Sequence, residues 1–375
     1  MEKELAARLA ALHGVKHVFL VASARVGLFL LLRAWNRPGG VILPAYDCIV
    51  VPEAIRFAGY SPVMVDIDLS TGNMSAAAVR QALSRSVSAV FATHLFGIPW
   101  DIHEIEEAVR GRGVLLVEDA AAALGAELRG RRVGGLADAG VISFHSTKVV
   151  SGEGGGAVLT SNDELASRVR ALLGSAGAPS LPPAIFLRAL ARKSATSALT
   201  YWLTRWGYGL LDGERMFETV KPRARMPRGY LARCSRFSSA LVLRQLLDLE
   251  RNVTRRRSIA RLYQTSLAGV PGLDPLAVPA DCAPAWIQFP VRARDKAALY
   301  RHMQRHGVDL SWSYRYSCAD SYRVDCPQAR IAANTVLGLP THPGVTDEQA
   351  RRACEAARSF GRSAAACTGL ASAGG

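Results

Sequence analysis

The stretch from Ser88 to Ala120, SAVFATHLFGIPWDIHEIEEAVRGRGVLLVEDA, contains the pattern that decides the fold. Two short apolar runs, SAVFATHLFG (88–97) and VLLVEDA (114–120), flank DIHEIEEAVRGRG (101–113), whose apolar residues recur at helical spacing. A strand, a helix and a second strand in this order predict a βαβ unit, in which the two strands lie parallel in one sheet.

The same alternation extends from Val41 to Ser161, so the sequence predicts an α/β fold with a mostly parallel central sheet flanked by helices. The other strand-like runs are VILPA (41–45), SPVMVDID (61–68), AGVISFHS (139–146) and GGAVLTS (155–161). Ligands bind such sheets beyond the carboxyl ends of the strands. The polar residues that close these runs are therefore candidates for one shared cleft: Asp47, Asp66, Asp68, His94, Asp119 and Lys148.

The chain of 375 residues is long enough for two domains, because one hydrophobic core rarely grows beyond roughly 250 to 300 residues. We expect a large domain over residues 1–240, and a linker helix with a smaller α+β domain over 241–375. Residues 238–268 have the spacing of one long helix. Residues 176–226 interrupt the alternation with an aromatic and basic excursion, for which we consider a cover over the site, a subunit contact and a peripheral membrane contact, the last not favoured.

Composition narrows the class of protein. With 49% apolar and 21% charged residues the chain is an ordinary globular protein. The N-terminal MEKELAARLAALHG lacks the basic and unbroken apolar regions of a secretory signal, so we expect a cytoplasmic protein. The seven cysteines form no CxxC pair and no zinc-like spacing with histidine, which indicates free thiols and no metal site.

The net charge of +15 is concentrated in one segment. Residues 176–260 hold 16 Lys and Arg against 5 Asp and Glu, a surplus of 11. Such a segment suits nucleic acid, an anionic membrane surface, an anionic small substrate or no partner at all, and charge alone does not choose among them.

The stretch SFHSTKVVSGEGGGAV (143–158) places Lys148 before a cluster of glycines. A phosphate-binding P-loop has the reverse order, glycines first and lysine last, and no GxGxxG fingerprint is present. A lysine at the end of a rigid element can instead bond covalently to a carbonyl group, as lysines that hold pyridoxal phosphate do. Such a site also needs a carboxylate at the pyridine nitrogen and donors for the phosphate; Asp119 and the helix start at Ser23 to Arg25 could supply them. The alternative is a strand-end cap, a helix cap and a surface lysine.

Several longer stretches carry a resemblance to a known family. They are PAYDCIVVPEAIRFAGYSPVMVDIDLSTGNM (44–74), THLFGIPWDIHEI (93–105), VEDAAAALGAELRGRRVGGLADAGVISFHSTK (117–148), SGEGGGAVLTSNDELASRVR (151–170) and LGLPTHPGVTDEQ (337–349). With them the chain resembles, from Val18 to Phe360, the DegT/DnrJ/EryC1/StrS family of pyridoxal-phosphate-dependent sugar aminotransferases, which have the fold-type I architecture. The resemblance implies a homodimer with shared active sites.

By this resemblance, Lys148 forms the Schiff base with the cofactor and moves the proton of the amino donor. Asp119 pairs with the pyridine nitrogen, Ser143 is a phosphate ligand, and the backbone amides of Arg25 and Val26 hold the phosphate. His94 is a further catalytic candidate from its place at a strand end, with a packed, hydrogen-bonded histidine as the alternative.

Three positions depart from the family pattern. Ala122 stands where members often have Gln or His near the phenolic oxygen of the cofactor. Cys48 stands where many have an aromatic residue that stacks on the pyridine ring, and Arg233 lies near the place of an asparagine that reaches the partner subunit's cofactor phosphate. We keep all three as cofactor-binding positions.

The implied reaction moves an amino group from an amino acid, usually glutamate in this family, to an anionic keto-sugar, in antibiotic or surface-polysaccharide biosynthesis. The departures keep open a different pyridoxal-phosphate reaction or the amination of a cyclitol or another non-nucleotide substrate. Sugar dehydratases that resemble the family have histidine in place of Lys148. A non-catalytic scaffold that binds a membrane or nucleic acid is a third hypothesis, against which Lys148, Asp119 and Ser143 weigh together.

Overall fold

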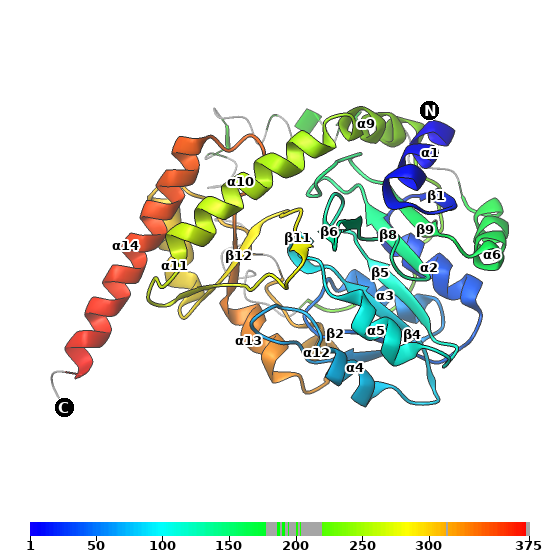
Figure 1. Ribbon diagram of the computed structural model, residues 1–375, viewed down its shortest axis with the longest axis horizontal. Helices are drawn as coiled ribbons and strands as arrows, with labels where there is room; N and C mark the ends of the chain where they lie inside the picture. Colours follow the sequence, from blue (N-terminus) through cyan, green and yellow to red (C-terminus); the bar gives the residue numbers. More distant parts are fainter. Residues whose placement is uncertain are drawn as a thin grey trace.

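The computed structural model describes residues 1–177, 220–312 and 314–372, with isolated positions between 186 and 203, and no side chains beyond 362. Its largest element is a seven-stranded sheet (Figure 1). In spatial order the strands are β1 (His17–Val21), β9 (Gly156–Thr160), β8 (Ala139–Ser143), β5 (Leu115–Asp119), β4 (Val87–Thr93), β2 (Gly40–Pro44) and β3 (Ser61–Val65). Only β9 runs against the other strands of this sheet. The predicted α/β fold with a mostly parallel sheet is confirmed, although β1 was not anticipated.

Helices cover both faces of this sheet because its strands alternate apolar residues between two cores. Val41 and Leu43 of β2 pack with one cluster, whereas Ile42 between them packs with the other. The first cluster includes α2 (Ala24–Trp35), α3 (Val50–Phe57) and α6 (Asp163–Gly174). The second includes α1 (Glu2–His13), α4 (Ala76–Ala82) and α5 (Ile102–Val109). Both faces are therefore closed, and the carboxyl ends of the strands are left for a ligand.

A smaller unit follows the large sheet in the chain. Its antiparallel sheet has the order β10 (Leu273–Pro275), β12 (Phe289–Ala293), β13 (Val336–Leu339). Its helices are α11 (Lys296–Arg305), α12 (Cys318–Tyr322), α13 (Pro327–Thr335) and α14 (Asp347–Ser372). A third sheet of β6 (Glu127–Leu128), β7 (Arg131–Arg132) and β11 (Cys282–Ala283) joins the two parts of the chain. The division into domains at residue 240 stays a prediction.

The prediction of one long helix over residues 238–268 was wrong. The structure has two helices, α9 (Arg236–Leu246) and α10 (Leu249–Leu267), separated at Leu247 and Asp248. The side chain of Gln245 exchanges hydrogen bonds with the backbone of Ser151, at 2.6 and 3.1 Å, which ties the end of α9 to the glycine loop. The apolar spacing continues across the break and so could not reveal it. The turn lets α9 pack on α1 while α10 runs across to α14 (Figure 1).

Two predictions, on the aromatic and basic excursion and on a membrane contact, concern segments that the structure describes only in part. The aromatic and basic excursion, residues 176–226, lies largely outside the described residues. Within the described part of the chain, every helix is too short or too polar to cross a bilayer.

Candidate functional site

The floor of the candidate site is formed where three neighbouring strands end. Asp119 is the last residue of β5 and Thr93 is the last of β4, and the two are paired across the sheet. Asp47 lies just beyond β2 on the other side of β4, and Thr93 Oγ1 donates to Asp47 Oδ2 at 2.8 Å. Parallel strands thus bring together polar groups that are far apart in sequence.

Asp119 is an almost completely buried carboxyl residue, with 5% of its surface exposed. Its Oδ1 accepts one hydrogen bond, from the amide of Ala121 at 3.0 Å. Burial raises the pKa of Asp119, while the Ala121 hydrogen bond and then the charge of Lys148 act in the opposite direction. A buried carboxyl of this kind gains most from a cationic partner, which a protonated pyridine nitrogen would provide.

Lys148 lies in the tight loop that follows β8, where its own amide donates to the carbonyl of His145 at 2.9 Å. Its side chain is half-buried and its charge acts on both Asp47 and Asp119. The loop is closed by the amide of Gly152, which donates to the carbonyl of Phe144 at 2.9 Å. The backbone of Lys148 is therefore held in a fixed turn, close enough to the two carboxyls for its charge to act on both.

A place for a phosphate group exists at the start of α2. Ser23 is at the N-cap position, but its side chain makes no capping hydrogen bond, so it is not the simple helix cap that we considered. Gly156 of β9 packs directly on this helix start, since a Cβ there would lie 2.6 Å from the amide nitrogen of Ala24. Ser143, the last residue of β8, is the register partner of Gly156, which brings its hydroxyl to the same corner. Helix amides and a serine hydroxyl are the donors that a phosphate needs.

The two amides predicted to hold this phosphate differ in their surroundings. The amide of Val26 donates to the carbonyl of Ser23 at 3.1 Å, within the first turn. Arg25 stands one residue earlier, in the part of the turn whose amides point along the helix axis away from the helix. Arg25 therefore has the better placed amide of the pair, and both assignments stay predictions.

Cys48 lies at the side of this floor, on the loop that also carries Asp47. Burial, first of all, raises the pKa of the Cys48 thiol, and the charges of Asp47, Lys148 and Asp119 act on it as well. The small unit approaches at the same point: Tyr316 Oη accepts from the amide of Ile49 at 2.9 Å. The role of Cys48 at the cofactor ring stays a prediction, and a thiol offers no aromatic face.

Tyr314 fills the space beside Cys48 from the small unit. Its ring makes an edge contact with Tyr46, with the centroids 5.6 Å apart, and it lies 6.1 Å from Phe96. Its backbone has a positive φ of 46°, an unusual conformation for a tyrosine that turns the chain toward the floor. These ring contacts join the small unit to the residues around the floor.

His94 is completely buried and both of its ring nitrogens have protein partners. Nδ1 accepts from the amide of Trp100 at 3.0 Å, so Nε2 carries the proton and donates to Glu118 Oε1 at 3.0 Å. This is the packed arrangement that we gave as the alternative. A catalytic role of His94 stays a prediction and would require it to act through its neighbours.

Glu118 was missed by sequence reasoning, although it is the partner that fixes His94. It also accepts from the amides of Gly134, Leu136 and Ala137 at 2.7, 2.6 and 3.0 Å. Burial pushes the pKa of Glu118 upward, but the hydrogen bond from His94 and these amides bring it below its usual value. The available signal was a glutamate inside an apolar strand, directly before Asp119.

The remaining predicted positions lie apart from the floor or at its edge. Ala122 is buried three residues after Asp119. Arg233 is exposed, and its guanidinium donates to the carbonyls of Leu173 and Gly174 at 3.3 and 3.2 Å, which caps the end of α6. Within one chain Arg233 therefore serves a helix, and its predicted contact with a second subunit stays a prediction.

The expectation of one cleft for all six strand-end residues was wrong for two of them. Asp66 accepts from the amides of Gln328 and Ala329 at 2.9 and 2.8 Å and so holds the start of α13. Asp68 accepts from Ser70 within a surface turn. Both follow the outer strand β3, which lies one strand beyond the floor.

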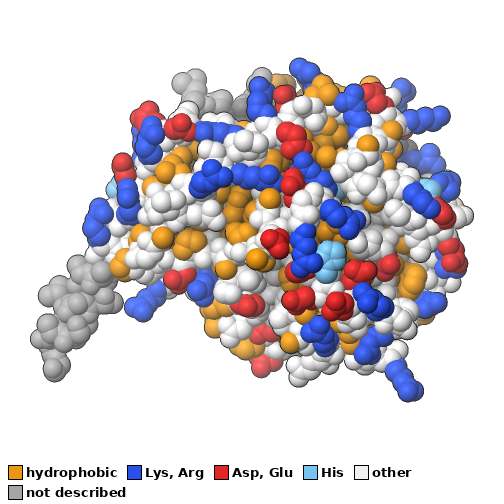
Figure 2. Space-filling model, viewed as in Figure 1, with side chains coloured by type: hydrophobic (Ala, Val, Ile, Leu, Met, Phe, Trp, Pro, Cys, Tyr) orange, Lys and Arg blue, Asp and Glu red, His pale blue; other side chains and the backbone are white. Residues whose placement is uncertain are grey.

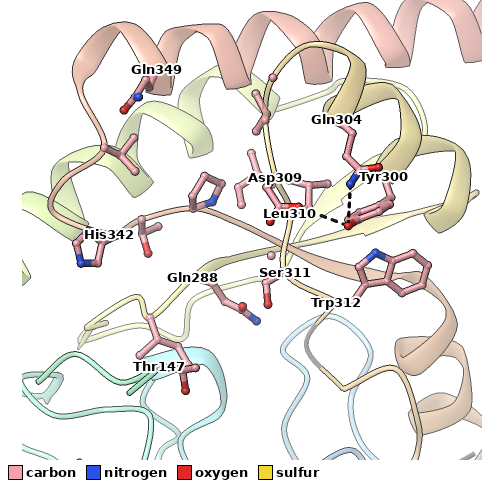
Figure 3. Close-up of a pocket in the computed structure, with 18 of the residues that line it drawn as sticks. Thr147, Gln288, Tyr300, Gln304, Asp309, Leu310, Ser311, Trp312, His342 and Gln349 are labelled. Carbon is pink, nitrogen blue, oxygen red and sulfur yellow. Dashed lines mark hydrogen bonds between the residues drawn. The ribbon is translucent and has the colours of Figure 1, made fainter. Parts of the chain in front are cut away.

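A cavity of about 1030 Å³ opens next to the loop of Lys148. Thr147 lies at one end and Gln349 at the other, with Gln288 and Ser311 between them (Figure 3). Two cations, Arg315 and Arg352, are among its lining residues. The volume is at the upper end of the range for small-molecule sites, about 300 to 1000 Å³. The cavity thus has room for a substrate much larger than an amino acid.

The arginines of α10, which belong to the basic segment, do not line this cavity. Arg256 is buried and donates to the carbonyls of Trp286 and Ile287. Arg255 pairs with Asp347 at 2.6 Å. On the face in Figure 2, basic side chains are interspersed with acidic ones. Part of the basic surplus therefore holds the molecule together.

The residues of the floor fit pyridoxal phosphate. A lysine amine, a buried carboxyl in need of a cation, and a helix start closed over by a glycine correspond to the aldehyde, the ring nitrogen and the phosphate of that cofactor. No three His, Cys, Asp or Glu side chains of the described residues cluster as metal ligands do.

Comparisons with known proteins agree with this geometry. The model of the DegT/DnrJ/EryC1/StrS aminotransferase family matches residues 1–358. DesI, solved in the presence of its TDP-sugar product, is 27% identical with a TM-score of 0.77, over 98% of this chain and 86% of DesI. DesV of S. venezuelae, solved in complex with a ketimine intermediate, is 25% identical with a TM-score of 0.77, over 96% of this chain and 89% of DesV.

A third structure supports the fold alone, because its sequence is more distant. The putative sugar aminotransferase Spr1654 from Streptococcus pneumoniae, solved in a PLP-form, is 20% identical with a TM-score of 0.76. The match covers 96% of this chain and 91% of Spr1654. The predicted resemblance, fold-type I architecture and cofactor are confirmed. The protein is a pyridoxal-phosphate-dependent aminotransferase, and it belongs to the DegT/DnrJ/EryC1/StrS family.

Proposed function

We propose that the protein moves an amino group from glutamate to the carbonyl carbon of a nucleotide-linked keto-sugar. The observation that carries the proposal is the cavity of about 1030 Å³ that Thr147, the residue before Lys148, helps to line, because this volume is larger than an amino acid alone needs. Its lining cations, Arg315 and Arg352, suit the diphosphate of such a substrate. DesI, a structural neighbour, was solved with a TDP-sugar product, which supports the same substrate class.

Each residue of the floor has a task in this reaction. Ser143 and the start of α2 would hold the phosphate of the cofactor, and Asp119 would hold its ring nitrogen in the protonated form. When bound, pyridoxal phosphate supplies an electron sink and carries the amino group from one substrate to the other. The amine of Lys148 would accept the α-proton of the donor and pass it to the cofactor, and in the second half of the reaction it would move a proton in the reverse sense, from the cofactor to the acceptor carbon.

The walls of the cavity would select and orient the acceptor. Gln288 and Thr341 offer polar groups along its length, and Trp312 offers an aromatic face. The reaction would take place in the cytoplasm, in keeping with six free cysteines among the described residues. We further propose a homodimer with shared sites, on the grounds of family membership.

A substrate panel tests the proposal. Purified protein is mixed with glutamate and with keto-sugars in nucleotide-linked and free form, or with a cyclitol ketone, and amino products are measured by mass spectrometry. We expect products only from nucleotide-linked acceptors, and none with Lys148→Ala. Equal kcat/KM values for the free sugar or the cyclitol would contradict the nucleotide-linked substrate.

A pair of arginine variants on α14 sharpens the test. Arg352→Gln removes a cation from the cavity wall, whereas Arg351→Gln removes a neighbouring cation that does not line it. We expect the first to raise the KM for the acceptor about tenfold, the value of one charge-assisted contact, with the KM for glutamate unchanged. The second variant is the control and should leave both KM values unchanged.

A further inference from the structure

The floor of the site contains a second buried carboxyl, that of Asp47, with 1% of its surface exposed. Each of its oxygens accepts a hydrogen bond: Oδ2 from Thr93 Oγ1 at 2.8 Å and Oδ1 from the amide of Cys48 at 2.6 Å. These contacts hold the carboxyl against the end of β4. Asp47 is therefore a fixed part of the site.

Asp47 and Asp119 flank the same residue. Thr93 is the register partner of Asp119 and also the hydrogen-bond donor to Asp47, so the two carboxyls stand on either side of it. Burial, and next the charge of Asp119, raise the pKa of Asp47 to about 8, although the hydrogen bonds from Thr93 and Cys48, and then the charge of Lys148, act in the opposite direction. The three groups thus form one electrostatic cluster.

The other titratable groups that face Asp47 are thiols and phenols. The thiol of Cys318 donates to the backbone carbonyl of Asp47 at 3.1 Å, and burial raises its pKa well above the usual value. Burial likewise raises the pKa of Cys48, Tyr314 and Tyr316. These groups are neutral around pH 7, so the charge of the cluster comes from two carboxyls and one lysine.

The cluster has more acidic groups than cations. Two ionised carboxylates with one ammonium would leave a net negative charge in a buried place, so the pair of carboxyls retains a proton over much of the neutral range. A cation that enters beside Asp119 changes this balance, because it adds a positive charge next to the pair and so favours the ionised form of both carboxyls.

We propose that Asp47 is a positioning residue that holds a proton in the cofactor-free protein and releases it to solvent when the cofactor's protonated ring nitrogen binds at Asp119. The proposal rests on the cofactor site and not on the identity of the acceptor.

The proton released by Asp47 makes cofactor binding depend on pH in a way that one substitution removes. Dissociation constants of pyridoxal phosphate are measured by fluorescence quenching from pH 6 to 9 for the wild type and Asp47→Asn. In the ratio of variant to wild type, the protons that the cofactor itself binds or releases in solution cancel. We expect the ratio to rise with pH, by at most about tenfold per pH unit below pH 8. A ratio that does not change with pH would overturn the proposal.

A second measurement uses the cofactor-free protein and separates proton binding from simple misfolding. Because the pKa of Asp47 is raised on folding, the folded form binds more protons between about pH 4 and 8, and the free energy of unfolding falls as the pH rises through this window. Asp47→Asn should lose this slope while still unfolding cooperatively. Asp325→Asn, at a side chain that is 89% exposed, is the control and should keep it. An equal slope in Asp47→Asn would also overturn the proposal.

Discussion

The packing of Gly156 on the start of α2 gives the most direct structural prediction. A Cβ at this position would lie 2.6 Å from the amide nitrogen of Ala24, 2.7 Å from the carbonyl oxygen of Ile142 and 2.8 Å from the carbonyl carbon of Ser23. All three atoms belong to the backbone, so no side chain can move aside. Gly156→Ala must therefore displace either β9 or the helix start that would hold the phosphate.

The size of the effect follows from this clash. Overpacking a close contact costs about 1 to 3 kcal/mol, and where that cost falls on the phosphate site it corresponds to roughly 5- to 150-fold in affinity. The assay is a fluorescence titration with pyridoxal phosphate, accompanied by thermal unfolding of the cofactor-free protein. We expect weaker binding, a lower melting temperature, or both.

Gly174→Ala is the matched control for this substitution. No atom lies within 4 Å of a Cβ built at Gly174, at the end of α6, so alanine should be tolerated there. Should Gly156→Ala bind the cofactor as tightly as Gly174→Ala and melt at the same temperature, the reasoning on the helix start would be refuted.

Three further predictions concern buried polar groups. Arg256→Met leaves the carbonyls of Trp286 and Ile287 without their donor and should lower the free energy of unfolding, measured by urea titration, by about 2 to 4 kcal/mol. Arg251→Met is the control, since this side chain is 83% exposed, and it should have little effect. Glu118→Gln replaces one carboxylate oxygen with an NH2 group, which would face the backbone amides that now donate to Glu118. It should lower the free energy of unfolding by about 2 to 3 kcal/mol and speed hydrogen exchange of the amides at residues 134–137. Unchanged exchange rates would contradict this prediction. Burial lowers the pKa of His13 from 6.5 to about 4, so between these pH values the unfolded chain binds a proton that the folded protein does not. The free energy of unfolding should therefore fall as the pH drops from 6.5 toward 4, by at most about 3 kcal/mol. In urea titrations at several pH values, His13→Gln should lack this part of the pH dependence.

The strands and the floor of the site could be predicted because they depend on local patterns. Buried parallel strands appear as continuous apolar runs, and each of the six runs found between Val41 and Ser161 became a strand of the large sheet. The residues that close neighbouring runs meet at one edge of the sheet, which is why Asp47 and Asp119 could be expected together. Spacing alone was enough for this step.

The features that the sequence did not predict correctly depend on contacts between residues distant in sequence. Asp66 closes a run just as Asp119 does, but its strand lies at the outside of the sheet and its partners are the amides of Gln328 and Ala329. The break between α9 and α10 follows a tie to Ser151 that no helical spacing encodes. The place of a strand-end residue and the end of a helix thus depend on strand order and loop contacts, which cannot be read from the spacing of residues in a single sequence.

The central claim is that Lys148 is the residue that bonds to pyridoxal phosphate. The most direct measurement is to incubate the protein with the cofactor, reduce it with borohydride and locate the modified lysine by peptide mass spectrometry. We expect one stable pyridoxyl adduct, on the peptide that contains Lys148, together with loss of the visible absorbance. An adduct on another lysine, or no adduct, would contradict the account.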